Sequence, residues 1–546
     1  MVKLILFICL VFFAEIGLSQ STAPVSVVWS QCFGGLGDDD IFSGGETYNN
    51  GFVMGGRTQS SDGDLIGNNG SFDYWILALD SNREIAFSKS YGGSQIDNCR
   101  YAIGNSDGQT YMAFGSSHSI NGGDLDSNQI IGDTAFSTFW LLKLDENGEI
   151  IFQKIYNGNG VHGGRAMVQT ENGYALLGWS TSTNNYFTGN YGQHDAYLMK
   201  VDNDGDMQWT KNFGGSSKEE CISLLETSDG GYIFSGSTLS NDFDFEGLNH
   251  GAKDMMVVKT DSLGNKLWAR AYGGEGSEQA LGISLDWDGN ILVCGEDSMP
   301  SGDCNNLNGD YDGWILKLNQ LNGDTIWTLN LGGSDKEVAL RFLSLPDKGY
   351  IGLISTSSTD GLLENQDLGH GDIWLVRLDS ARNVVWNKTF GGFWGETANE
   401  IKILDNGYMV WGITSSRDGD VVGHYEVDDE DRNKDLWAFY VIDSTLFSAD
   451  TTIIGVAVND ENKFFLSVYP SPSNDGIFNL QGTLKETGEL EILVVNILGE
   501  IVHTETFKQT TGTFEKKLNL SGCAKGAYEV IVKNKSNNLT KKIIIQ

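Results

Sequence analysis

The sequence predicts an all-β protein, a seven-bladed β-propeller followed by a small β-sandwich. Three observations lead to this prediction. A short segment recurs seven times at a spacing of about 59 residues, which is typical of a repeat architecture. The 546 residues include 70 Gly, 14 Trp, 19 Tyr and 27 Phe but only 5 Pro, a composition typical of turn-rich β-structure. The segment after the predicted signal peptide is a strand of the kind that the last repeat lacks.

The recurring segment is a strand that ends in two glycines, or in Asn-Gly in the third copy. Its copies begin at Trp29, Phe87, Phe152, Trp209, Trp268, Trp327 and Trp386. In the fifth repeat, segments 280–287 and 291–298 are joined by Asp-Gly-Asn, and segments 312–319 and 325–331 by a turn containing Asn-Gly. Such turns between alternating hydrophobic residues predict hairpins. Four antiparallel strands in each of seven repeats predict a propeller.

The two ends of the repeat array complement each other. The seventh repeat stops at Asp443 without a fourth strand, whereas residues 25–33 form a fourth strand with no first three. We therefore predict that 25–33 pairs beside 436–441 and closes the ring, which removes the open sheet edges. Aromatic residues at the recurring third-strand positions, such as Trp75, are expected to pack between blades.

The remaining segments set the domain boundaries. Residues 1–19 have Lys3, an apolar run and small residues near Ser19, as a secretory signal peptide does. We assign 25–443 to the propeller, 444–463 to a linker and 464–546 to a C-terminal domain. No apolar run is long enough for a transmembrane segment. The net charge of −37 disfavours nucleic acids and anionic membranes as partners and leaves cations, glycans and proteins.

One face of the predicted propeller is the better candidate for a binding site. The Gly-Gly segments and the long loops between second and third strands emerge there, whereas tight turns occupy the opposite face. Long loops on a rigid scaffold commonly carry function. We call this the long-loop face.

An acid stands four residues after the second glycine in six repeats. These acids are Asp39, Asp97, Glu219, Glu278, Glu337 and Glu396. One interpretation is a ring of carboxylates that binds a ligand or cations near the channel mouth. The other is that each acid accepts hydrogen bonds from backbone N–H groups of its own turn, and recurrence in nearly every blade favours it. The third repeat carries His162 and Arg165 instead, and we place specific binding there.

The long loops also carry Asp-Gly clusters. Asp62, Asp64, Asp418 and Asp420 are candidate Ca²⁺ ligands, although Asp-Gly is also an ordinary turn signal. Four loop histidines, His194, His250, His370 and His424, lack zinc-binding spacing and are expected to be solvated. No nucleophile elbow, phosphate-binding loop or CxxC pair is present in the sequence, so we assign no catalytic residue and no certain cofactor.

The C-terminal segment resembles the type IX secretion sorting domain of Bacteroidetes. The resemblance rests on the opening YPSP…G, the central NILGE, and the closing GAY with a Lys-rich, apolar end. Its residues are Tyr469, Pro470, Pro472, Gly476, Gly499, Gly526 and Tyr528. The resemblance implies a small β-sandwich, recognition by the type IX translocon and sortase machinery, and a protein that is released or attached to the cell surface.

The propeller repeats are similar to repeats of secreted bacterial proteins that carry such tails, some of them labelled endoglucanase-like. Three functions follow as hypotheses. The first is a binding protein for a glycan or a protein ligand. The second is a polysaccharide-active hydrolase or lyase that uses non-repeated residues of the long-loop face, for example around Arg165. The third is a structural adhesin.

Overall fold

The computed structural model describes residues 24–65, 67–119, 122–130, 136–303, 309–364, 366, 369–425, 433–446, 465–469, 476–484, 488–496, 501–509, 512–524, 526–533 and 538–545. The chain divides into two compact units, Met1–Asp450 and Thr451–Gln546. The predicted signal peptide, residues 1–19, and most of the predicted linker lie outside the described residues. No helix among the described segments is both long and apolar enough to cross a membrane.

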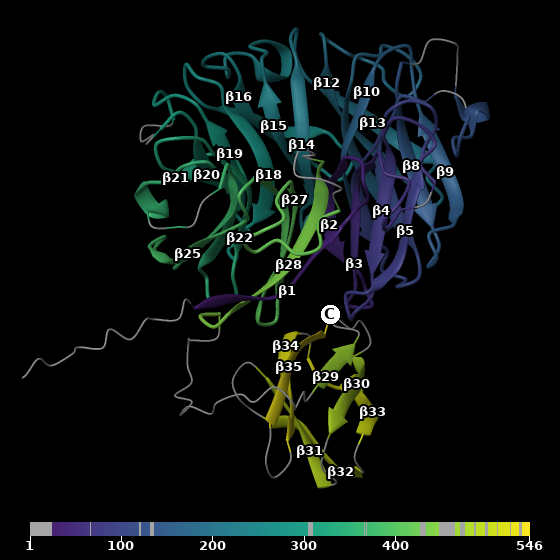
Figure 1. Ribbon diagram of the computed structural model, residues 1–546, viewed down its shortest axis with the longest axis vertical. Helices are drawn as coiled ribbons and strands as arrows, with labels where there is room; N and C mark the ends of the chain where they lie inside the picture. The colour runs from purple at the N-terminus through teal and green to yellow at the C-terminus, as the bar shows by residue number, and fades with distance from the viewer. Residues whose placement is uncertain are drawn as a thin grey trace, which may run out of the picture. The chain divides into compact units, whose positions relative to one another are not determined.

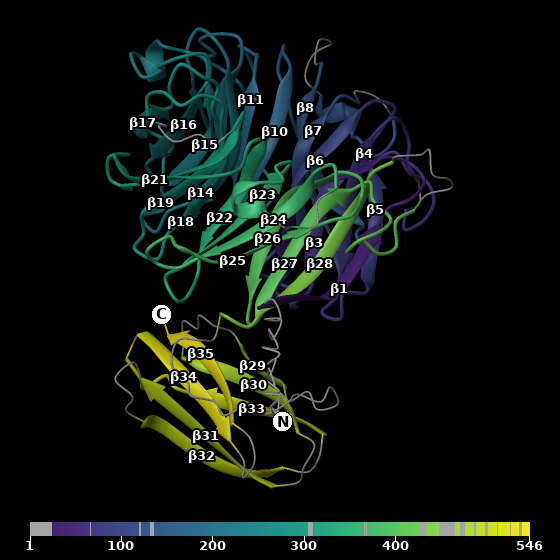
Figure 2. The same ribbon diagram turned by 60° about the vertical axis from the view of Figure 1, so that its left-hand side comes forward.

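The first unit consists of seven four-stranded antiparallel sheets that follow one another around a ring (Figures 1 and 2). Blade 1 has β2 (Asp39–Glu46), β3 (Phe52–Thr58), β4 (Asp73–Leu79) and β5 (Ile85–Tyr91). Blade 2 has β6 (Asp97–Gly104), β7 (Tyr111–Ser117), β8 (Thr138–Leu144) and β9 (Ile150–Tyr156). Blade 3 has β10 (His162–Thr170), β11 (Gly173–Ser180), β12 (Asp195–Val201) and β13 (Met207–Phe213).

Blades 4 to 7 repeat this order. Blade 4 has β14 (Glu219–Glu226), β15 (Tyr232–Thr238), β16 (Asp254–Thr260) and β17 (Lys266–Tyr272). Blade 5 has β18 (Gln279–Leu285), β19 (Ile291–Asp297), β20 (Asp312–Leu318) and β21 (Thr325–Leu331). Blade 6 has β22 (Glu337–Ser344), β23 (Tyr350–Thr356), β24 (Asp372–Leu378) and β25 (Val384–Phe390). Blade 7 has β26 (Glu396–Leu404), β27 (Gly407–Thr414), β28 (Asp435–Asp443) and β1 (Val25–Phe33). Three 3-10 turns lie in the long loops: η1 (Ser127–Gln129), η2 (Phe243–Phe245) and η3 (Gly361–Leu363).

The N-terminal strand closes the ring, as the sequence predicts. β1 pairs antiparallel with β28, with Val27 opposite Val441 and Trp29 opposite Tyr440. Figure 1 shows the purple β1 beside the green β28. Blade 7 is therefore completed by a segment about 400 residues away in sequence.

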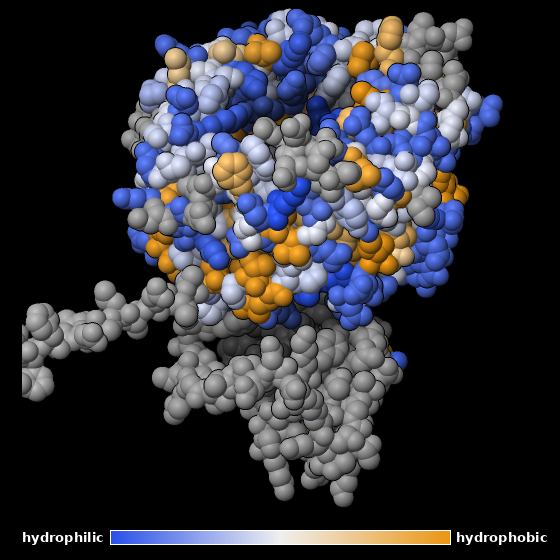
Figure 3. All heavy atoms as spheres, in the orientation of Figure 1, coloured by the Kyte–Doolittle hydropathy of each residue, from blue (hydrophilic) through white to orange (hydrophobic). Residues whose placement is uncertain are grey.

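Hydrophobic clusters fill all seven boundaries between neighbouring blades. At the closing boundary, Phe33 and Leu436 of blade 7 pack with Trp75 of blade 1. The third-strand tryptophans Trp75, Trp140, Trp314, Trp374 and Trp437 are fully buried, which confirms their predicted packing role. The face of the propeller visible in Figure 3 is largely hydrophilic, as the acidic composition leads one to expect.

The second unit is a two-sheet sandwich. One sheet has the order β29-β30-β33 and the other β32-β31-β34-β35. The strands are β29 (Phe465–Tyr469), β30 (Ile477–Leu484), β31 (Gly488–Asn496), β32 (Ile501–Gln509), β33 (Gly512–Asn519), β34 (Gly526–Lys533) and β35 (Asn538–Ile545). Phe478 and Leu518 of the first sheet share a core with Ile492 and Val530 of the second.

The motif residues of this unit lie at strand ends. Tyr469 ends β29 and Gly526 begins β34. Gly476 has φ 69° and accepts the backbone N–H of Leu520, a turn that favours glycine. The hydroxyl of Tyr528 donates to the carbonyl of Ala524 at 2.6 Å. Pro470, Pro472 and Gly499 lie outside the described residues.

Candidate functional site

The six recurring acids are buried inside the blade boundaries. The second glycine of each Gly-Gly pair donates its backbone N–H to the acid four residues later over 2.7–3.1 Å: Gly35 to Asp39, Gly93 to Asp97, Gly215 to Glu219, Gly274 to Glu278, Gly333 to Glu337 and Gly392 to Glu396. A hydroxyl at the end of the second strand adds a further bond in most blades, as from Thr356 to Glu337 at 2.7 Å. This geometry favours the structural interpretation over a ligand-binding ring at the surface.

A second buried carboxylate faces each of these acids from the first residue of a third strand. The pairs are Asp435 with Asp39, Asp73 with Asp97, Asp195 with Glu219, Asp254 with Glu278, Asp312 with Glu337 and Asp372 with Glu396. A Cβ on the first glycine of the adjoining Gly-Gly pair would lie within 3.0 Å of both carboxylates in every case. The glycine recurs because no side chain fits above the pair.

Burial raises the pKa of nine of these carboxyl groups, which belong to five of the six pairs. The pKa rises to about 6 for Asp39 and Asp73, to about 7 for Glu219, and to about 8 for Glu278 and Asp435. Loss of solvation is the main cause, and for all of these except Asp39 the charge of a neighbouring carboxylate adds to it. These nine groups therefore still bind protons at a pH where exposed carboxylates have released theirs.

We expect the protein to be more stable at pH 5 than at pH 8. A folded-state pKa above the unfolded value means that the folded state binds more protons, so the free energy of unfolding falls as pH rises from about 4 towards about 8. The expected difference in Tm is at least about 5 °C at fixed ionic strength. The double variant Glu278→Gln, Asp435→Asn should reduce this difference in Tm. The control variant Glu146→Gln, Asp204→Asn changes two exposed acids and should not reduce it. Equal melting temperatures at both pH values would contradict this account.

The third repeat departs from the pattern at all three positions of the boundary. Thr138 replaces the third-strand acid, His162 replaces the first-strand acid, and Asn157 replaces the first glycine. His162 is buried, its Nε2 accepts the N–H of Gly158 at 3.1 Å, and its ring stacks on Phe187. Burial lowers its pKa to about 4, so the ring is neutral at pH 7. With no carboxylate pair present, a side chain fits in the first-glycine position, and His162 performs the structural task of the missing acid.

The aspartates of the long loops fasten each loop to the neighbouring Gly-Gly segment. Asp62 accepts the N–H of Leu36 at 2.8 Å and Asp418 that of Phe393 at 2.8 Å. Asp64 accepts the N–H of Gly34, and Asp420 donates its N–H to the carbonyl of Gly391. No cluster of three or more candidate metal ligands occurs within the described segments. Calcium binding by these loops stays a prediction.

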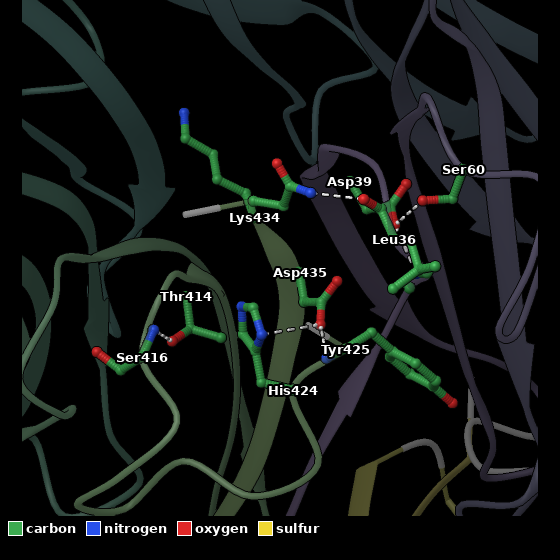
Figure 4. Close-up of polar contacts among 12 residues, drawn as sticks. Leu36, Asp39, Ser60, Thr414, Ser416, His424, Tyr425, Lys434 and Asp435 are labelled. Atoms are coloured by element: carbon green, nitrogen blue, oxygen red, sulfur yellow. Dashed lines mark hydrogen bonds and ion pairs between the residues drawn. The ribbon is translucent and has the colours of Figure 1, made fainter. Parts of the chain in front are cut away.

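The closing boundary contains one loop histidine that is not solvated. The side chain of His424, expected at the surface, is 1% exposed, and its Nδ1 lies 3.7 Å from Asp435 Oδ2. Figure 4 shows Asp435 beside His424 and Tyr425, whose N–H it accepts at 2.7 Å. Across the boundary, Asp39 donates its N–H to the carbonyl of Lys434. The folded ring buries this histidine side chain, which sequence spacing could not reveal.

The first strand of each blade lines the central channel and carries one β-bulge. Neighbouring first strands contact one another all the way around the ring. The extra residue lies three positions after the boundary acid or His162, about 10 Å along the strand from the long-loop face. These residues are Phe42, Arg100, Arg165, Ile222, Leu281, Leu340 and Asn399, and we call them the channel ring.

All seven channel-ring residues are partly exposed, whereas the residue before each is buried. Because the first strands border the central channel, we infer that these side chains face it; Leu340 also packs against the core between blades 6 and 7. The ring is chemically uneven: Ile222, Leu281 and Leu340 are consecutive around one side, and Arg100 and Arg165 are neighbours on the other.

Three arginines gather on the side of blades 1 to 3. Arg57 of β3 pairs with Asp40 at 2.6 Å and bonds to Asn98 at 3.2 Å. The guanidinium of Arg100 lies 3.9 Å from the centroid of the Phe42 ring. Burial and then the charges of Arg165 and Arg57 lower the pKa of Arg100 to about 9, which leaves it cationic at pH 7.

These cations are incompletely neutralised. Neither Arg100 nor Arg165 makes a hydrogen bond or an ion pair with a residue whose position is described, and Arg165 Nε is buried without a partner. Among the described residues, Asp40 is the carboxylate that bonds to this group, through its ion pair with Arg57. Three guanidinium groups beside one bonded carboxylate can hold an anion.

Sequence reasoning selected Arg165 but missed Arg57 and Arg100. Of the residues predicted to bind, the structure leaves Arg165 partly exposed and buries His162 and the six acids. A signal for Arg100 exists in the sequence, since it occupies the same repeat position as Arg165. Arg57 lies on a second strand, and only the folded ring places it beside them.

The comparisons identify the C-terminal unit. Residues 467–546 match the family model of the secretion system C-terminal sorting domain. The chain thus carries a type IX sorting domain, interacts with that secretion machinery, and is secreted or attached to the cell surface. No curated protein matches the sequence.

Similar solved structures belong to several kinds of protein. A puromycin hydrolase is 10% identical with a TM-score of 0.42, over 81% of this chain and 58% of that one. A glycoside hydrolase of family 32 from Bifidobacterium adolescentis is 7% identical with a TM-score of 0.25, over 95% of each chain. An exotype rhamnogalacturonan lyase is 10% identical with a TM-score of 0.23, over 94% of this chain and 91% of that one. The chain spans a little over half the length of the puromycin hydrolase. Likenesses this weak say nothing about activity.

Proposed function

We propose that this chain, which ends in a secretion system sorting domain, is a binding protein whose propeller holds an acidic glycan at its channel. The observation that carries the proposal is the group of Arg57, Arg100 and Arg165 on one side of the channel ring. An oxyanion on a ligand supplies acceptors for guanidinium donors that the described part of the fold leaves unused. A channel lined by seven side chains admits a saccharide chain or a chain end but no folded partner.

The overall charge restricts the ligand further. A protein with a net charge of −37 repels polyanions at long range, and salt weakens but does not reverse this repulsion. A ligand with one or a few acidic groups on a neutral chain avoids most of it. The extended carboxyl end of a peptide is the alternative with the same chemistry.

The test is binding of the full chain to acidic and neutral oligosaccharides and to short peptides, together with an assay for released reducing ends. Arg100→Gln with Arg165→Gln is expected to weaken binding of a uronic-acid oligosaccharide by at least about 100-fold, because charge-assisted bonds contribute about 1.5–3 kcal/mol each. Lys89→Gln with Lys154→Gln removes the same charge from surface ion pairs and should leave affinity unchanged.

Three results would contradict the proposal. Equal affinity of the arginine variant and the wild type for the acidic oligosaccharide would contradict the channel site. Preference for peptides would favour the protein ligand. Release of reducing ends would favour the polysaccharide-active enzyme.

A further inference from the structure

Each long loop places a residue in the left-handed backbone region at one equivalent position around the propeller, about five residues after the second strand. These residues are Gly63 (φ 64°), Gly123 (64°), Asn185 (55°), Phe243 (51°), Gly302 (58°), Gly361 (63°) and Gly419 (66°). Glycine adopts this conformation without strain, and asparagine tolerates it better than other residues. Phe243 is the one aromatic residue with a positive φ among the residues described.

The position also leaves little room for a side chain. A Cβ on Gly63, Gly123, Gly302 or Gly419 would lie within 2.4 Å of the carbonyl oxygen of the first glycine in the facing Gly-Gly pair. In those four blades the next residue donates its N–H to that carbonyl over 2.8–3.1 Å. In blade 4 the corresponding bond, from Asp244 to Gly214, is 3.2 Å long. Phe243 thus occupies a position that disfavours any side chain, and a bulky one most.

Burial of the Phe243 side chain does not offset this backbone strain. It is 58% exposed, and its ring stacks on Tyr191 of the neighbouring blade at 4.7 Å between centroids and 19° between planes. Tyr191 is itself 47% exposed. Strained backbone that persists without a packing gain points to a functional constraint. Two exposed rings, stacked nearly parallel on the long-loop face, form a flat aromatic surface.

We propose that Tyr191 and Phe243 form a platform that binds the apolar face of a pyranose sugar. The face of an aromatic ring is electronegative and attracts the electropositive C–H groups of a sugar ring laid against it. Exposed Asn241 and Gln193 adjoin the two aromatics in sequence and can bond sugar hydroxyls, and the Asp244–Lys266 ion pair lies in the same loop region. Two rings offer far less area than the roughly 800 Å² per partner of a stable protein interface, so a saccharide fits better than a protein.

This inference rests on the proposed glycan-binding function and adds to it a second site, for neutral sugar units of the same ligand. The test is affinity electrophoresis of the full chain in gels containing hydroxyethyl cellulose, xyloglucan, laminarin or galactomannan. At least one of these neutral polysaccharides is expected to retard the wild type. Phe243→Gly and Tyr191→Ser should each weaken that binding at least tenfold. Tyr48→Ser, an exposed aromatic in a tight turn of the opposite face, should not.

The thermal stability of the variants separates a binding role from a structural one. Phe243→Gly is expected to leave Tm unchanged or to raise it by about 1–2 °C, because relief of the left-handed strain offsets the lost ring contact. Phe243→Asn, which copies Asn185 of blade 3, should behave alike. A fall in Tm of more than about 3 °C for both variants would assign the ring a structural role and overturn the proposal.

The electrophoresis can also overturn the platform proposal, and its results distinguish a failure of the platform from a failure of the channel site. The platform is wrong if no neutral polysaccharide retards the wild type, or if both aromatic variants bind as the wild type does. If the binding of acidic oligosaccharides still depends on Arg100 and Arg165 in that case, the proposal of a channel site stands. If binding of neutral polysaccharides depends on Phe243 but binding of acidic oligosaccharides does not depend on the arginines, only the channel site is contradicted.

Discussion

A chain that begins at residue 34 is expected to lose its cooperative fold. β1 supplies the fourth strand of blade 7 and pairs with β28 along its length, burying Val25, Cys32 and Phe33. Burial of a large apolar side chain contributes about 1.5–3 kcal/mol, so the loss is on the order of 5–10 kcal/mol, comparable with the total stability of many proteins. The exposed edge of β28 would also promote association.

Size-exclusion chromatography and thermal unfolding measure this effect. A chain that begins at residue 24 keeps β1 and is the matched control, which should be monomeric and melt like the full chain. A monomeric chain from residue 34 with an unchanged melting temperature would show that β1 does not hold the ring closed.

Arg341→Met is expected to destabilise the protein by about 3–5 kcal/mol. Arg341 makes a bidentate pair with Glu400 of the next blade, both bonds at 3.1 Å, and donates to the carbonyl of Leu281 in the preceding blade at 3.2 Å. The Glu400 side chain is only 6% exposed. Removing its partner leaves a buried charge without compensation, which costs more than the pair itself contributes.

A double-mutant cycle distinguishes this from simple loss of packing. Arg341→Met with Glu400→Leu replaces both charges by apolar groups and should lie within about 1 kcal/mol of the wild type in urea unfolding. If the two single changes add up in the double variant, the pair is not coupled and the explanation fails.

The architecture was predictable because each repeat carries its own local signals. Asp-Gly and Asn-Gly turns define the hairpins, and the strand missing after Asp443 together with the extra strand at 25–33 fixes the closure. The Gly-Gly pairs are visible in the sequence as well, but the reason for their recurrence is not. The folded structure shows that reason, because Asp73 and Asp97 of different blades both lie where a side chain on Gly92 would be.

The candidate sites were less predictable because they depend on which residues the ring brings together. Arg57, Arg100 and Arg165 are far apart in sequence, and the bulges that turn two of them into the channel leave no sequence signal of their own. Phe243 is similar: its sequence neighbours form an ordinary acidic loop. Its significance lies in the backbone angle that it shares with the glycines of five other blades.

Closure of the ring is tested most directly by a disulfide across its last strand pair. Ser26 lies opposite Ile442 in the β1–β28 register, within reach of a disulfide. Oxidation of the Ser26→Cys, Ile442→Cys variant is expected to link the two positions, seen by peptide mapping, and to raise Tm. The pair Ser26→Cys with Val441→Cys points to opposite faces of the sheet and should stay reduced. Failure of the 26–442 link, or formation of the 26–441 link in its place, would contradict the closure on which the channel and both binding sites depend.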